Sequence, residues 1–177
     1  MIKKIFNIAF YVMAIFYVFL MFDLFFRINI ISSSNGISRS YNLIPFKTIW
    51  DYASGNIYVS KTMVRYNILG NIAVIIPYGL YLQVLLKNKV FGKSLWIIIG
   101  TSVSIEIIQY IFGLGAADID DVILNVCGGV IGIIGYKVLR KLFREESKTK
   151  TAITLISLVI GMPVMFVYFM VCIRRYF

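Results

Sequence analysis

The chain contains no histidine, and only two of its 177 residues are cysteines. The absence of histidine excludes histidine general bases, nucleophiles and metal ligands, which leaves carboxylates, amides, hydroxyls, arginine and lysine for any chemistry. Cys127 and Cys172 both lie in apolar stretches, and their spacing matches no metal motif, so we interpret them as packing residues. We therefore predict neither a metal site nor a cofactor.

The sequence also has too few polar residues for a soluble domain. Hydrophobic residues make up 60% of it and its mean hydropathy is +0.86, values outside the range of an ordinary water-soluble domain. The stretches long enough to cross a bilayer are approximately Ile5–Phe26, Asn67–Leu86, Ser94–Phe112, Asp121–Leu139 and Ala152–Ile173. We predict an all-α membrane protein, in which residues 1–177 form a single integral membrane domain, a compact bundle of about five transmembrane helices.

The distribution of basic residues predicts how the bundle is oriented. The turn from Lys87 to Lys93 contains three lysines, whereas the turn from Gly113 to Asp120 contains no basic residue. Positive residues are enriched in cytoplasmic connections, so we expect a cytoplasmic N-terminus and an extracytoplasmic C-terminus. The net charge of +10 is assigned to anionic lipid head groups rather than to nucleic acid, because the basic residues flank the spans.

The one long connection, from Ile28 to Tyr66, lies outside in this topology. It carries apolar and aromatic side chains that are poorly suited to water, and Pro45 is expected to set a bend. We predict an interfacial or re-entrant segment between the first and second spans, with Trp50 and Tyr52 near the level of the head groups.

Polar side chains occur in pairs along three of the spans. Asn67 and Asn71, Glu106 and Gln109, and Asp121 and Asn125 are each separated by three or four residues, so each pair shares one helix face. In the predicted topology, all three pairs lie in the outer part of the membrane. We predict an outward-facing pocket between these helices, because ionisable groups in a membrane are costly and usually line a functional site.

Other roles for these residues stay open. Asp118, Asp120 and Asp121 can cap a helix, and for Asp120 the cap is the preferred interpretation. The asparagines can act as interhelical hydrogen-bonding groups. A set of oxygen ligands also suits a hard cation such as Mg²⁺ or Ca²⁺, although the spacing matches no calcium loop.

Taken in order, these residues resemble the VanZ-like family of small bacterial membrane proteins over about residues 39–136. The resemblance rests on Asn42-Leu43-Ile44-Pro45-Phe46, Asn67 with Asn71, Pro77-Tyr78-Gly79, Glu106 with Gln109, and Asp118-Ile119-Asp120-Asp121 leading to Asn125 and Gly128-Gly129. Many members carry an arginine shortly before the acidic block, where this chain has Gly115-Ala116-Ala117. Arg39 or Arg65 would then have to supply any positive charge opposite the acids.

The resemblance implies a protein of the bacterial plasma membrane that lowers susceptibility to lipophilic glycopeptide or lipopeptide antibiotics, teicoplanin-type compounds in particular. From the residues, we expect the pocket to bind or alter an envelope lipid, with membrane lipids, including an anionic or lipid-linked cell-wall precursor, as partners. The alternatives are an intramembrane enzyme acting on a lipid-linked phosphate or sugar, for which Glu106 and Asp121 are the candidate catalytic residues, and a small transporter or channel. The candidate ligand-binding residues are Arg39, Asn42, Arg65, Asn67, Asn71, Glu106, Gln109, Asp118, Asp120, Asp121 and Asn125.

Overall fold

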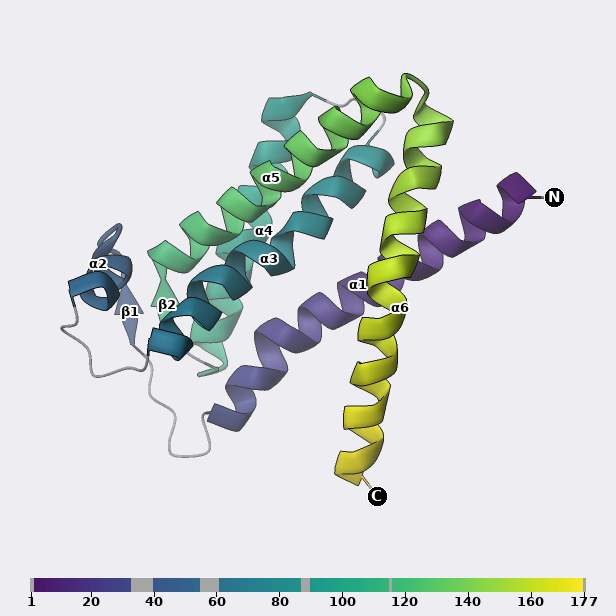
Figure 1. The fold of residues 1–177 in the computed structure, drawn as a ribbon. Coiled ribbons are helices and arrows are strands. Elements are labelled where there is room, and N and C mark those ends of the chain that lie inside the picture. The colour runs from purple at the N-terminus through teal and green to yellow at the C-terminus, as the bar shows by residue number, and fades with distance from the viewer. Residues whose placement is uncertain (1, 33–39, 55–60, 87–89, 115, 177) are drawn as a thin grey trace. The chain divides into compact units, whose positions relative to one another are not determined.

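A computed structural model of the chain describes residues 2–32, 40–54, 61–86, 90–114 and 116–176 (Figure 1). The contacts within it divide the chain into two compact units, one of residues 21–135 and the other of residues 1–20 together with 136–177. The first unit contains most of the predicted polar site.

Within the described residues, five helices are long and apolar enough to cross a membrane, as predicted from the sequence. They are α1 (Ile2–Ser32), α3 (Lys61–Leu85), α4 (Phe91–Ile111), α5 (Ile119–Phe143) and α6 (Glu146–Tyr176). All five expose large apolar side chains, among them Phe22, Leu69, Trp96, Ile134 and Phe166. Because a lipid environment accepts such faces and a helix satisfies its own backbone hydrogen bonds, the prediction of an all-α membrane protein is confirmed.

A strip of glycines on α5 brings its backbone against that of α3. A Cβ atom added at Gly128 would collide with the carbonyl oxygen of Ile72, and one added at Gly132 would collide with that of Ile76. On the other helix, a Cβ at Gly79 would collide with the carbonyl oxygen of Gly129. The glycine spacing therefore has the packing role expected of small residues in membrane helices.

Helix α4 packs against the same pair of helices. A Cβ at Gly129 would meet the side chain of Ile98, which is fully buried. Nearer the start of α4, the buried side chain of Gln83 donates a hydrogen bond to Ser94 Oγ at 2.5 Å. Helices α3, α4 and α5 thus form the core of this unit, and α3 continues through Pro77 without a break.

A very short parallel sheet joins two segments that are far apart in the sequence. Strand β1 (Tyr41–Asn42) pairs with β2 (Ala117–Asp118), with Tyr41 opposite Ala117 and Asn42 opposite Asp118. Helix α2 (Lys47–Ser54) follows β1, and Figure 1 shows both of them beside β2, where α5 begins. The predicted interfacial segment between the first two spans therefore contains a strand and a helix of its own.

The second unit pairs the start of α1 with α6. Lys150 Nζ donates a hydrogen bond to Asn7 Oδ1 at 2.5 Å and lies 4.5 Å from the centre of the Phe10 ring. Farther along, a Cβ added at Gly161 would collide with the end of the Met13 side chain. A cation over an aromatic face and a close glycine contact therefore hold these two helices together.

Candidate functional site

The turn after α4 determines where the acidic block lies. Gly113 adopts a left-handed backbone with φ 64°, its N–H bonds to the carbonyl of Tyr110, and Leu114 N–H bonds to the carbonyl of Gln109. This is a Schellman ending, in which a glycine beyond the helix reverses the chain. The reversal brings Asp118 back to Glu106, whose Oε2 accepts the Asp118 backbone N–H at 3.0 Å.

Asp118 connects three segments through its two carboxylate oxygens. Oδ1 accepts the backbone N–H of Asp120 at 2.9 Å and the side-chain amide of Asn42 at 3.1 Å, while Oδ2 accepts the hydroxyl of Thr48 at 2.5 Å. The bond to Asp120 is the N-cap bond of α5, so the predicted capping role is confirmed for Asp118. The other two bonds attach β1 and α2 to the same carboxylate.

Asp120 is a helix cap as preferred from the sequence, but it caps a different helix. Its Oδ1 accepts the N–H of Phe46 at 2.5 Å and its Oδ2 accepts the N–H of Ile49 at 3.1 Å, so it satisfies the start of α2 from across the fold. Phe46 has a positive φ of 64°, which is uncommon for a non-glycine residue. The carboxylate thus holds a strained turn and complements the dipole of α2.

Asp121 joins α5 to α3. Its Oδ1 accepts a hydrogen bond from the side-chain amide of Asn71 at 2.6 Å, which gives Asn71 the interhelical role considered from the sequence. Asn125 lies one turn farther along α5 and is completely buried, yet neither its Nδ2 nor its Oδ1 has a hydrogen-bond partner among the described residues. Asn125 therefore provides no interhelical hydrogen bond in the described chain.

The polar side chains surround a pocket of about 230 Å³. Its walls come from helices α2, α3, α4 and α5, from β2 and from the turn that leads into β2. They consist of Thr48, Tyr52, Asn67, Gln109, Ala116, Asp118 and Asp121. Gln109 is fixed because its amide donates to the backbone carbonyl of Phe25 at 3.0 Å. Glu106 is not in the wall; it is buried, with 6% of its surface exposed, and supports Asp118 through the bond described above.

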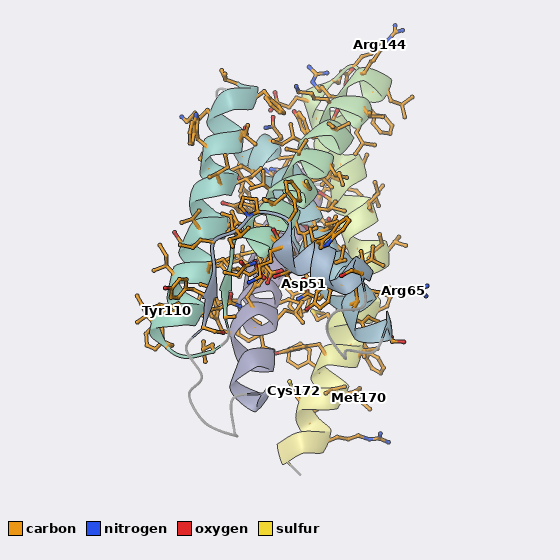
Figure 2. All side chains as sticks on the ribbon, turned by 90° about the vertical axis from the view of Figure 1, so that its left-hand side faces the viewer. Asp51, Arg65, Tyr110, Arg144, Met170 and Cys172 are labelled. Carbon is orange, nitrogen blue, oxygen red and sulfur yellow. The ribbon has the colours of Figure 1, made fainter. Side chains whose placement is uncertain are left out.

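Two candidate residues are not brought to the pocket. Arg65 is exposed, and Figure 2 shows it projecting outward from α3. Within the described chain it makes no ion pair with Glu106, Asp118, Asp120 or Asp121. Arg39 lies outside the described residues.

Two of the polar wall residues, Thr48 and Tyr52, were not among the candidates. They are four residues apart on α2 and therefore share one face, directly after the Asn42–Phe46 motif. Tyr52 is half-buried in the pocket wall, whereas Trp50 is exposed, and the expectation that both lie near the head groups stays a prediction. A helical period applied to residues 46–52 would have placed Thr48 and Tyr52 on one face and Trp50 on the other.

The chemistry of the pocket is that of hydrogen bonding. Among the described residues, no three histidine, cysteine, aspartate or glutamate side chains lie close enough together to hold a metal ion. Hydroxyl, amide and carboxylate groups converge from different elements, a pattern that recognises the hydroxyls, amides or amines of a polar head group.

Burial raises the pKa of the Tyr52 phenol above its ordinary value of 10.0, and the negative charges of Asp121 and Asp118 act in the same direction. The unfolded protein therefore loses this proton at a lower pH than the folded one. The stability that depends on neutral Tyr52 is complete below the ordinary pKa and is lost as the pH rises through the folded pKa. We expect the unfolding temperature, measured in detergent, to fall less in Tyr52→Phe than in the unchanged protein as the pH rises above 10.0. An identical fall in both proteins would contradict the raised pKa of Tyr52.

Comparisons with known proteins agree with the sequence resemblance. The VanZ/LLP1 family model matches residues 8–140, a range that begins in α1 and so extends beyond the expected core of residues 39–136. Protein VanZ from Enterococcus faecium is 34% identical over 125 residues, which cover 71% of this chain and 70% of that protein. No solved structure matches the chain. The chain belongs to the VanZ/LLP1 family.

Proposed function

We propose that this protein lowers the susceptibility of a bacterial cell to lipophilic glycopeptide and lipopeptide antibiotics, teicoplanin-type compounds in particular, by binding or altering an envelope lipid in its polar pocket. The single observation that carries the proposal is a hydrogen-bonding pocket of about 230 Å³ built on helices that are apolar enough to cross a membrane. Family membership supports the link to antibiotic susceptibility.

The orientation expected from the lysines would put the pocket on the extracytoplasmic side of the membrane. With the N-terminus in the cytoplasm, the α4–α5 turn and the segment containing β1 and α2 lie outside, and both contribute to the pocket. The pocket would therefore be on the side of the lipids of the outer leaflet.

Asp121 is the wall residue best suited to contact a ligand directly. One of its oxygens is engaged by Asn71, and no partner within the described chain engages the other. Asp118, in contrast, uses both oxygens to hold β1, α2 and the start of α5. A ligand amine or hydroxyl would find its acceptor at Asp121.

We expect Asp121→Asn to abolish the protection against teicoplanin while the protein still inserts and accumulates. The substitution keeps one oxygen for Asn71 but replaces the other carboxyl oxygen, an acceptor, with an NH2 group. Minimum inhibitory concentrations of strains expressing each variant, with membrane levels measured by immunoblot, test this. Unchanged protection by a well-expressed Asp121→Asn protein would remove the proposal.

Asp51→Asn is the matched control for that experiment. Asp51 lies on α2 but is not part of the pocket wall, and its carboxylate makes no ion pair within the described residues. The same replacement of a carboxyl group by an amide there should leave protection intact. Incubation of the purified protein with a labelled lipid precursor then separates binding from alteration, because only alteration yields a new labelled product.

A further inference from the structure

Helix α2 has two faces with opposite chemistry. Thr48 and Tyr52 lie on the face that forms part of the pocket wall. Trp50 lies two residues from each of them, so it is on the opposite face of the helix, and it is 69% exposed. Phe46, which directly precedes the helix, is 60% exposed. The same short helix therefore presents polar groups to the pocket and aromatic groups away from it.

The exposed face of α2 belongs to a larger apolar patch. All of its members expose at least 60% of their surface, and they are Tyr41, Leu43, Ile44, Phe46 and Trp50. The polar groups of the same segment are already occupied, since Asn42 and Thr48 bond to Asp118 and the N–H groups of Phe46 and Ile49 bond to Asp120. A patch of this kind is unfavourable in water and marks an interaction surface.

The patch continues onto the lipid-facing surface of a span. The ring of Tyr41 meets the ring of Tyr110 edge-on, with 6.5 Å between their centres. Tyr110, Ile111 and Phe112 are exposed apolar residues at the end of α4, which is a candidate span, and Figure 2 shows Tyr110 on the outer side of that helix. Because lipid covers the exposed side of α4, the same lipid is positioned to cover the patch.

We propose that the segment from Tyr41 to Trp50 is seated in the boundary between head groups and acyl chains, so that the pocket opens sideways into the leaflet. Trp50 and Tyr41 have the amphipathic rings that favour this layer, and the exposed Lys47 can extend to the head groups. The pocket wall formed by Thr48 and Tyr52 then lies at head-group depth. Its ligand is an amphiphile that enters laterally with its acyl chains still in the membrane.

The part of this inference that concerns a ligand rests on the proposed function, whereas the seating of α2 does not. The seating is tested by tryptophan fluorescence, because the chain has only two tryptophans, Trp50 and Trp96. In the Trp96→Phe protein, reconstituted in phosphatidylcholine vesicles, the emission comes from Trp50 alone. The vesicles carry bromine either on the acyl chain close to the head group or near the bilayer centre.

If the segment is seated, bromine close to the head group reduces Trp50 emission to roughly half, bromine at the centre has a smaller effect, and aqueous acrylamide quenches weakly. Strong quenching by acrylamide without quenching by brominated lipid overturns the seating. The Trp50→Phe protein is the matched control, since Trp96 is exposed on a span and must be quenched by lipid in either case.

The sideways opening is tested with a tryptophan in the pocket wall. Tyr52→Trp in a protein that also carries Trp50→Phe and Trp96→Phe should be quenched by bromine close to the head group, and acrylamide quenching alone would overturn lateral entry. These fluorescence outcomes do not depend on antibiotic susceptibility. If Trp50 is quenched by brominated lipid but Asp121→Asn keeps its protection, the proposed function is rejected. If Trp50 is quenched only by acrylamide but Asp121→Asn loses its protection, the seating is rejected.

Discussion

Gly132→Ala is expected to separate α3 from α5 and to cause the largest loss of stability of any alanine substitution at a glycine on α5. The new Cβ would collide with the carbonyl oxygen of Ile76 and would lie 2.9 Å from Gly79 Cα and 3.0 Å from Leu80 N. All three neighbours are backbone atoms of a helix, so none can move without distorting its hydrogen bonds. Overpacking of this kind costs about 1–3 kcal/mol, and the immovable backbone places this site at the upper end.

The effect is measured as a fall in unfolding temperature in detergent, and Gly100→Ala is the matched control. Gly100 lies inside α4 with no atom within 4 Å of an added Cβ. Alanine there should be neutral or stabilising, because it favours a helix over glycine by about 1 kcal/mol. Equal unfolding temperatures for the two variants would contradict the close approach of α3 and α5.

The spans were predictable because their signal is long and local. A run of about 20 apolar residues is typical of a membrane-spanning helix and rare in soluble domains, and the five helices confirm the five predicted stretches. The two-residue strands were not predictable, because β1 and β2 are too short to have a pattern. They are held by contacts between groups far apart in the chain, such as Asn42 and Asp118, which are 76 positions apart. Such pairing depends on tertiary contacts.

For the candidate site, helical spacing identified most of the cluster but did not assign the partners. It correctly grouped Asp121 with α3 amides, since Asn71 bonds to Asp121. It did not foresee that Asp120 would cap α2 rather than its own helix, because a cap on another element leaves no local sequence signal. The ligand-binding role of the cluster stays a prediction.

Asp120→Ala is expected to release α2 from the rest of its unit. The substitution removes both oxygens that accept the N–H groups of Phe46 and Ile49, so the turn with a positive φ at Phe46 loses the hydrogen bond that Asp120 provides. Hydrogen bonds to a charged group contribute about 1.5–3 kcal/mol, so losing this carboxylate favours the undocked segment by at least about 2 kcal/mol.

Hydrogen exchange of the amides of Phe46 and Ile49 reports this release directly. A loss of about 2 kcal/mol in local stability corresponds to exchange roughly 30 times faster, while amides inside α5 should change little. Asp51→Ala is the control, because it removes a carboxylate from α2 itself without touching the cap.

Because α2 carries Thr48 and Tyr52, its release also removes one wall of the pocket. Asp120→Ala should therefore lose protection, although Asp120 does not line the pocket. Unchanged exchange at both amides in Asp120→Ala would show that α2 is held by other contacts, and protection should then persist.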